Sequence, residues 1–432
     1  MILDAGLVLI LSFLGLLIAG VPIGICIAAS SAVTVLLALP VDVAIFTTAQ
    51  KMVSSLDSFT LLAVPFFILS GVLMNNGGIA LRLVNFAKLF SGRIPGSLAH
   101  TNIVGNMMFG AISGSAIAAS TSIGGVMVPM GEKEGYSRPF SASANIASAP
   151  TGMLIPPTTA FILYALASGG TSISALFAGG LVAGCLWGGG CILVAYLIAK
   201  SRNYTTKLNL RDSSVQAVIA QAMPSLMLIA IIIGGIVFGI FTAVEASAIS
   251  VIYTMFLTMV VYRTIDLRGL LVSLIKATET TGVIMFLLAA SSAMSFAMSI
   301  TGLPAALSDA ILGLSDNPVI VLLIITAMLL IIGCFMDIGP AILIFTPILL
   351  PITSAIGIDP IHFGIIMVFN LCIGTITPPV GTGLFIGAGI AKEKVENLLL
   401  PLLPFYLVIL VTLLLITYIP SITMFLPRAM GL

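Results

Sequence analysis

Two short segments of this chain combine hydroxyl side chains, glycines and two adjacent prolines, a set that suits the binding of a cation and an anion. Residues 147 to 160 read Ala-Ser-Ala-Pro-Thr-Gly-Met-Leu-Ile-Pro-Pro-Thr-Thr-Ala. Residues 370 to 382 read Asn-Leu-Cys-Ile-Gly-Thr-Ile-Thr-Pro-Pro-Val-Gly-Thr. Four pairs of residues in and before these segments lie 222 positions apart: Pro129 and Pro351, Gly135 and Gly357, Gly152 and Gly374, and Pro156 and Pro378.

Each of these segments lies inside an apolar run that is long enough to cross a membrane. Two adjacent prolines remove backbone donors and push the preceding residue out of the α-helical region, so each run is predicted to be a broken helix. Interrupted backbone is tolerated at membrane depth only where it is buried in protein or lines a cavity. Two matched breaks therefore predict a substrate or ion site.

An alkali cation needs hard oxygen donors, which carbonyls of unwound backbone and hydroxyl groups supply. In the first half the candidate sodium ligands are Ser113, Ser115, Ala149, Pro150 and Gly152, and in the second half they are Asp337, Gly339, Gly374, Thr375 and Thr377. Helix starts after the breaks, at Thr158, Thr159 and Thr382, would present free N–H groups to an anionic substrate. The alternative is that the hydroxyls bond only their own backbone, as they often do in membrane helices.

Asp337 is the only acid in the apolar middle of a broken or re-entrant segment. A carboxylate at that depth costs about 2.5 to 3.5 kcal/mol even on the most permissive scale, so it is expected to face a wet cavity or a partner. It is interpreted as contacting a polar substrate or setting the charge of a cation site, with a structural role at a tip as the alternative. Ser115 occupies the equivalent position in the first half, at the same offset. Glu245 is interpreted as a second buried acid that pairs with another helix or subunit.

The composition places the chain in a membrane. Hydrophobic residues make up 59% of the 432 residues and charged residues only 7%, against about 25% charged residues in soluble domains. The net charge of +1 gives no support for nucleic-acid binding. The five cysteines form no C-x-x-C pair and are predicted to be small core residues. Trp187, the single tryptophan, is predicted to serve in packing.

No enzyme signature is present. His100 and His362 are isolated, no paired carboxylates occur at a useful spacing, and no phosphate-binding loop indicates ATP hydrolysis. An intramembrane hydrolase would need a nucleophile and a base, and the candidate pair of Ser113 or Ser115 with Asp337 lacks a histidine. Transport, if active, would draw on an ion gradient, and no organic cofactor is expected.

The apolar pattern predicts an all-α, multi-pass membrane protein. Each half holds a re-entrant helical hairpin, at about 96–131 and 318–355, and a broken helix, at about 140–168 and 363–390. The other predicted spans are 3–20, 22–39, 60–76, 173–199, 217–240, 243–262, 280–301 and 398–420, and residues 79–93 are predicted to form an amphipathic surface helix. The first span is interpreted as retained rather than cleaved, because no basic segment precedes it.

Charge in the loops predicts how the two halves relate. The basic loop with Arg82, Lys88 and Arg93 corresponds to residues 303–317, which are acidic only. Because basic loops favour the cytoplasm, equivalent loops are placed on opposite sides of the membrane. The halves, 1–212 and 213–432, are thus predicted to be inverted repeats, with the loops 200–211, 263–276 and 392–394 cytoplasmic and both termini outside. Parallel repeats, or no repeat, are the alternatives.

The hairpins, the Ser-Gly-Ser tip at 113–115 and the two Pro-Pro segments resemble the large membrane subunit of a tripartite ATP-independent periplasmic (TRAP) transporter, over essentially the whole chain. The resemblance implies a multi-pass protein of the bacterial inner membrane that works with a small membrane subunit and a periplasmic substrate-binding protein. It implies sodium-driven import of a carboxylate by an elevator-like movement of a transport domain against a scaffold.

Residue by residue, the resemblance implies sodium sites around Ser113, Ser115 and Gly152, and around Gly374, Thr375 and Thr377, with Asp337 near the substrate. A sialic acid is favoured over a C4-dicarboxylate, since no Arg or Lys lies in the hairpins or breaks to clamp two carboxylates. The rivals are a sodium/dicarboxylate carrier that works without a binding protein, an intramembrane hydrolase and a passive channel.

Overall fold

The computed structural model describes residues 2–91, 94–204, 215–313, 315 and 317–432, and this part of the chain is helical, without a β-strand. Eight of its helical segments are long and apolar enough to cross a bilayer. In the first half the helices are α1 (Ile2–Ile18), α2 (Ile23–Ala38), α3 (Val41–Ser54), η1 (Phe59–Leu62), α4 (Ala63–Asn76), α5 (Ile79–Ser91), α6 (Ser97–Ser113), α7 (Ala116–Lys133), α8 (Arg138–Ser148), η2 (Ala149–Met153), α9 (Thr159–Ala167) and α10 (Ile173–Ser201).

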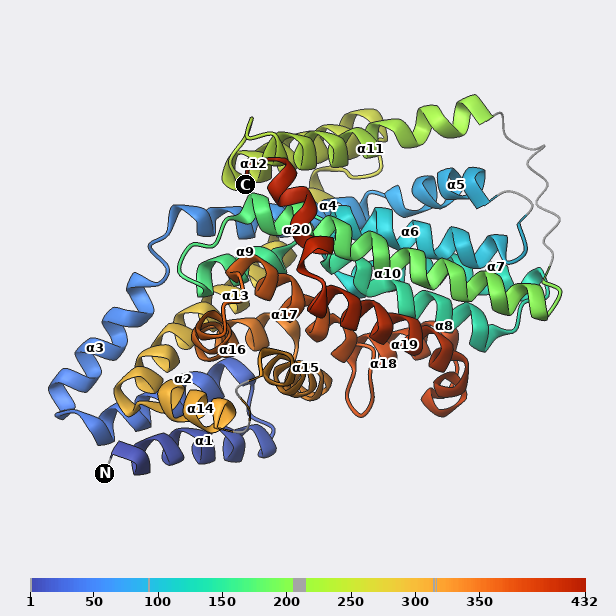
Figure 1. Cartoon of the computed structure of the whole chain (residues 1–432). Helices are drawn as coiled ribbons and strands as arrows, with labels where there is room; N and C mark the ends of the chain where they lie inside the picture. Colours follow the sequence, from blue (N-terminus) through green and yellow to red (C-terminus); the bar gives the residue numbers. More distant parts are fainter. Residues whose placement is uncertain (1, 92–93, 205–214, 314, 316) are drawn as a thin grey trace.

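The helices of the second half are α11 (Val215–Val237), α12 (Ala243–Phe256) with the π-helical turn η4 (Leu257–Val261), α13 (Leu267–Thr301), α14 (Leu303–Leu312), α15 (Pro318–Phe335), α16 (Ile338–Ala355), α17 (Pro360–Gly374), α18 (Thr382–Ala391), α19 (Val395–Tyr418) and α20 (Pro420–Ala429). The second half repeats the order of hairpin and broken helix, but the single helix α13 stands where the first half has α3, η1 and α4. Figure 1 shows both halves in sequence colours. When the first half is shifted by the offset seen in the sequence, the bounds of α7 coincide with those of α16, and α6 and α8 begin within one position of α15 and α17.

Each predicted hairpin is a pair of helices joined by a very short turn. In the first, α6 and α7 pack together and are separated only by Gly114 and Ser115; in the second, α15 and α16 are separated by Met336 and Asp337. The second arm of each hairpin packs on the far part of the other half's broken helix: α7 contacts α18, and α16 contacts α9. The two halves are therefore interlocked through their hairpins.

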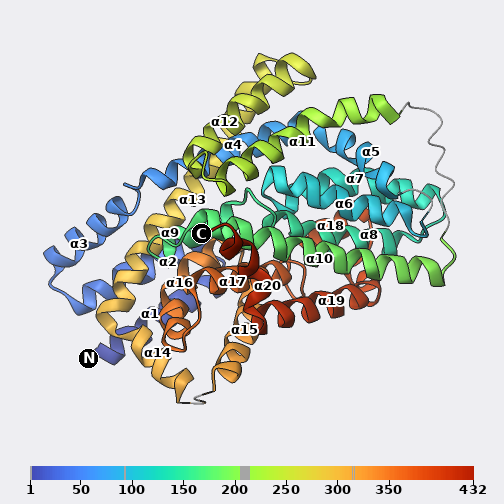
Figure 2. The ribbon, with the colours of Figure 1, turned by 45° about the horizontal axis from the view of Figure 1, so that its top comes forward.

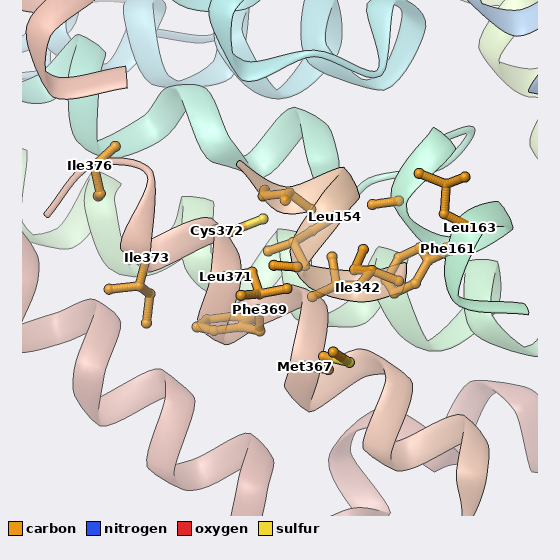
Figure 3. Close-up of a cluster of buried hydrophobic side chains, with 14 of the residues drawn as sticks. Leu154, Phe161, Leu163, Ile342, Met367, Phe369, Leu371, Cys372, Ile373 and Ile376 are labelled. Carbon is orange, nitrogen blue, oxygen red and sulfur yellow. The ribbon is translucent and has the colours of Figure 1, made fainter. Parts of the chain in front are cut away.

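The core between the two breaks is apolar and is shared by both halves. Figure 3 shows Leu154, Phe161 and Leu163 of the first half beside Ile342 of α16 and a run of side chains from α17. Phe161, Phe369 and Leu371 are fully buried. Trp187 of α10 is buried as well, packs on Phe369 with 4.7 Å between ring centroids, and donates a 2.7 Å hydrogen bond to the carbonyl of Ala147.

The hairpins and broken helices form one group of helices, and a second group is centred on α13. Within it, α13 contacts α1, α2, α3 and α4, and α4 also contacts α12. Figures 1 and 2 agree that α3 and the N-terminal helices lie at one end of the molecule, away from α8 and α19. Many large apolar side chains on these helices are exposed, for example Phe46, Val53 and Leu271, as expected for surfaces that face lipid.

One predicted loop proved to be helical, one helix was not predicted, and one side chain was wrongly interpreted as buried. Residues 263–276 were predicted as a loop before a span at 280, but α13 begins at Leu267 and runs through Arg268 and Lys276 as one helix of 35 residues. Asp266 caps its start by accepting a 2.7 Å hydrogen bond from the Gly269 N–H. No proline interrupts the helix, so its charged residues stay helical with exposed side chains.

The other two corrections concern α20 and Glu245. The helix α20 was not predicted, although Pro420 ends α19 and suits the first position of a new helix. Glu245 was interpreted as buried, but it is exposed and forms a capping box: its carboxylate accepts from the Thr242 N–H at 2.8 Å, and its own N–H donates to the Thr242 hydroxyl.

Further predictions are decided only in part. Cys26, Cys191 and Cys372 are buried as predicted, Cys334 is half-buried, and Cys185 is exposed. Arg93, Lys207, Arg211, Asp316 and the 212/213 boundary between the halves lie outside the described residues.

Candidate functional site

The tip of the first hairpin is a left-handed turn between two serines. Gly114 adopts φ +60°, a conformation that glycine accepts without a steric penalty. Ser115 is extended and begins α7, where its hydroxyl accepts a 3.3 Å hydrogen bond from the Ala118 N–H. The Ser113 hydroxyl lies 3.4 Å from the Ser115 carbonyl, to which it donates. Both serines are half-buried, so their oxygens stay within reach of a small ion.

The first break lies directly against this tip. A methyl group placed on Gly114 would lie 3.3 Å from the carbonyl oxygen of Pro157, so the tip touches the backbone between the break and α9. Ala149, Pro150 and Gly152 form the buried 3-10 helix η2. Thr158 caps α9, because its hydroxyl accepts from the Ala160 N–H at 3.1 Å.

The second tip consists of Met336 and Asp337, both with extended backbone. Asp337 occupies the capping position of α16, but its carboxylate makes no capping hydrogen bond and is exposed. Gly339, two residues on, lies close to Leu163 of α9: a methyl group there would be 3.7 Å from a methyl carbon of Leu163. The structure thus leaves the carboxylate open to a ligand.

The second break is stabilised by its own backbone. The Thr375 carbonyl accepts from the Gly383 N–H at 2.8 Å, which ties the end of α17 to the start of α18. The Thr375 hydroxyl donates to the Cys372 carbonyl and the Thr377 hydroxyl to the Ile373 carbonyl, each at 2.7 Å. These two hydroxyls therefore bond their own backbone, as the alternative interpretation of the sequence expected. Each oxygen still has lone pairs that can coordinate a cation. Thr382 is exposed at the start of α18.

In both halves the first hairpin arm crosses the broken helix at a pair of glycines. A methyl group on Gly152 would lie 2.3 Å from the Cα atom of Gly110 in α6. A methyl group on Gly374 would lie 2.2 Å from the carbonyl carbon of Gly333 in α15. Only hydrogen fits at these positions, so the two backbones come together where the sequence predicted cation ligands.

The two breaks differ in their exposure. Pro156, Pro157 and Thr158 are buried, and Pro157 lies near Leu228 and Ile232 of α11 at a small surface recess. Pro378, Pro379 and Val380 are exposed. The covering helices therefore enclose one break and leave the other open.

The described residues contain no group of three or more His, Cys, Asp or Glu side chains that could hold a metal ion. A cation site at these tips and breaks would be built of carbonyl and hydroxyl oxygens with at most one carboxylate, which is a suitable set for a hard monovalent ion.

Sequence reasoning missed a buried amide network that joins α6, α7 and α8. The Asn106 side-chain amide donates to the Asn145 side chain at 3.0 Å and to the Ser148 hydroxyl at 2.8 Å. The Asn145 amide in turn donates to the Ser120 hydroxyl at 3.0 Å and to the Ser120 carbonyl at 3.1 Å. The available signal was the presence of asparagines in apolar helices, because a buried amide needs partners.

We expect Asn145→Ala to lower the thermal unfolding midpoint of the detergent-purified protein, because the substitution removes the side-chain acceptor of the Asn106 amide and the donor to Ser120. The free energy of unfolding should fall by about 1 to 3 kcal/mol, which is the cost of leaving buried polar groups unpaired. Asn397→Ala is the matched control, since Asn397 is exposed and bonds only the nearby Glu393 side chain. Equal midpoints for the two variants would show that the network contributes no stability.

A multi-pass helical protein with two hairpins and two broken helices, and with hydroxyls and one free carboxylate at their tips, has the architecture of a secondary transporter. The family model described as "Tripartite ATP-independent periplasmic transporter, DctM component" matches residues 10–422. The chain belongs to this family, and it is a membrane transport protein of the inner membrane, not an enzyme.

Three similar proteins illustrate the range within the family. The chain is 50% identical to the uncharacterized protein YgiK of Salmonella typhimurium, with 98% of this chain and 97% of the relative covered. It is 37% identical to the sialic acid TRAP transporter large permease protein SiaM of Vibrio cholerae, with 97% of both covered. It is 38% identical to the isethionate TRAP transporter permease protein DctMQ of Oleidesulfovibrio alaskensis, where the match covers 95% of this chain but only 64% of that protein.

Among solved structures, the YdaH transporter of Alcanivorax borkumensis has a similar fold. The TM-score is 0.65 at 15% sequence identity, with 85% of this chain and 86% of that chain covered. This likeness concerns the fold alone.

Proposed function

We propose that this chain imports an organic acid together with sodium, with a sialic acid as the favoured substrate and a C4-dicarboxylate as the second candidate. The observation that carries the proposal is the matched pair of sites, in each of which the first arm of a hairpin crosses a broken helix at a glycine pair near the hairpin tip. Family members named for sialic acid and for C4-dicarboxylates resemble this chain at 37% and 36% identity.

Sodium coupling is supported by the chemistry of the two sites. In the first, the oxygens of Ser113 and Ser115 lie at the tip, and Gly114 between them approaches the carbonyl oxygen of Pro157. In the second, Thr375 and Thr377 keep lone pairs beside Gly374. Asp337 would compensate part of the charge of a bound cation or contact the polar part of the substrate.

An elevator movement and inverted repeats are supported by the arrangement of the helices. At one constant offset the bounds of α7 match those of α16, and α6 and α8 begin within one position of α15 and α17. The hairpin of each half packs on the broken helix of the other. We propose that these elements move together as a transport domain against a scaffold that includes α2, α4, α12 and α13.

The proposed partners are a small membrane subunit and a periplasmic binding protein, both outside this chain. The isethionate relative supports the first, because this chain covers only 64% of it and the remainder leaves room for a further membrane segment. A stand-alone sodium/dicarboxylate carrier is the alternative.

We expect proteoliposomes with this chain and its small subunit to take up radiolabelled sialic acid under an inward sodium gradient, in the presence of the binding protein. Succinate is the matched second substrate. Uptake that persists without a sodium gradient would contradict the sodium sites and favour the passive channel. Uptake that is unaffected by the binding protein would favour the stand-alone carrier.

A further inference from the structure

A cavity of about 740 Å³ lies between the two groups of helices. Its walls come from the residues before and within η1, the turn between α9 and α10, the start of α12, and the middle of α13 and α16. None of the residues predicted as sodium or substrate ligands lines it. The cavity is therefore a feature that the proposed tips and breaks do not account for.

The lining of this cavity is rich in hydroxyls and free of charge. Ten of its 22 lining residues are serine or threonine, and none has an ionisable side chain. The hydroxyl groups of Ser58, Thr60, Ser174 and Ser295 have no hydrogen-bond partner in the described part of the chain, so each can both donate and accept. The Ser291 hydroxyl donates at 2.7 Å to the Leu343 carbonyl, which leaves its oxygen as an acceptor.

The charges around the cavity disfavour a compact dianion. The Glu245 carboxylate accepts a hydrogen bond from the N–H of Thr242, which lines the cavity. Asp57 lies between the lining residues Ser55 and Ser58, and its side chain is exposed. The ammonium group of Lys51 lies 5.6 Å from the centre of the Phe296 ring, while its carbonyl accepts from Ser292. A ligand that binds here would be held by neutral hydrogen bonds and by contacts with apolar lining residues such as Phe59 and Leu288.

One cavity position has an enclosed counterpart in the first half. Ser70, the counterpart of Ser292 at the repeat offset, is buried in α4 and hydrogen-bonds the Ser250 and Thr254 hydroxyls of α12 at 2.5 and 3.0 Å. At this position the two halves therefore differ, because the second-half serine lines an open cavity and the first-half serine is enclosed. The volume of the cavity lies within the range of about 300 to 1,000 Å³ that is typical of sites that enclose a ligand of drug size.

We propose that this cavity binds the hydroxylated ring or chain of a sugar acid. The charge-based orientation of the loops puts the cavity on the outer side of the membrane, so it would receive the substrate before the hairpin tips do. The inference rests on the proposed import of an organic acid and narrows it to a polyhydroxylated one.

The test is uptake of sialic acid and of succinate by the complete transporter with Ser295→Val and, separately, Ser58→Val. Each substitution should raise the KM for sialic acid about three- to tenfold, the effect of one lost hydrogen bond, and change the KM for succinate less than twofold. Ser299→Val is the control, because Ser299 lies one turn from Ser295 on α13 but is exposed and does not line the cavity. Values of KM equal to that of the control would overturn the inference, although uptake by the native chain would still support the proposed function.

A second readout is independent of transport. In intact cells, Ser295→Cys in a background that carries Cys185→Ala, because Cys185 is exposed, should react with a membrane-impermeant maleimide, and sialic acid should slow the reaction. A rate that sialic acid does not change would overturn the inference. If the native transporter takes up neither acid but sialic acid protects the introduced cysteine, the proposed function would be contradicted. The assignment of the cavity as a sugar-acid site would still hold.

Discussion

Gly374→Ala is expected to reduce sodium-driven uptake by at least tenfold and to lower the unfolding midpoint of the purified protein. The added methyl group would lie 2.2 and 2.4 Å from the carbonyl carbon and the Cα atom of Gly333, and a backbone cannot turn aside as a flexible side chain can. Overpacking of this kind costs about 1 to 3 kcal/mol and shifts backbone. Because Thr375 follows Gly374 directly, the backbone shift would displace Thr375 and Thr377, which are predicted sodium ligands.

Gly389→Ala is the matched control for this prediction. Gly389 lies in the adjacent helix α18, is exposed, and has no atom within 4 Å of an added methyl group. Gly152→Ala should repeat the effect of Gly374→Ala in the first half, where the methyl group would approach Gly110 at 2.3 Å. If Gly374→Ala keeps the midpoint and uptake of the control, then the close crossing of α15 and α17 is not required.

The hairpins and breaks could be predicted from sequence because their determinants are local. Adjacent prolines end a helix wherever they occur, and the hairpin at 318–355 was predicted with the bounds that the structure shows for α15 and α16. The two halves align at one offset, so Ser115 at the first tip could be matched with Asp337 at the second tip.

The parts that failed depend on tertiary contacts. The charged residues in 263–276 predict an exposed segment, and their side chains are exposed. Exposure alone, however, does not distinguish a loop from the polar start of the long helix α13. Glu245 was interpreted as buried because its neighbours are apolar, whereas its partner is the cap three residues earlier. The network around Asn145 joins three helices, and no spacing along the chain predicts which amides meet.

The site shows the same division. Sequence predicted which residues lie at the tips and breaks, and the structure places Ser113, Ser115 and Asp337 there. It could not predict that the hydroxyls of Thr375 and Thr377 donate to their own helix, nor that Thr158 is buried while Thr382 is exposed. These outcomes depend on tertiary packing, because α11 and its neighbours cover the first break while the second break stays exposed.

Asp337→Asn is expected to lower uptake about 10- to 100-fold, the equivalent of one hydrogen bond to a charged group. The structure gives the carboxylate no capping bond at the start of α16, so its loss should leave the fold intact. The unfolding midpoint should stay the same or rise, because a neutral amide avoids the cost of a charge at membrane depth. A variant that folds normally and transports poorly would show that the carboxylate acts on a ligand.

Asp359→Asn is the control for this substitution, since Asp359 is exposed and caps α17 by accepting from the Ile361 N–H at 2.8 Å, a role that asparagine also fills. The sodium dependence then separates the two roles of Asp337. A higher sodium concentration for half-maximal uptake would place the carboxylate at a cation, whereas a higher KM for the acid alone would place it at the substrate. Unchanged uptake in Asp337→Asn would support the structural role at the tip, and a cation in the second half would then be coordinated only by neutral oxygens, those of Thr375, Thr377 and backbone carbonyls.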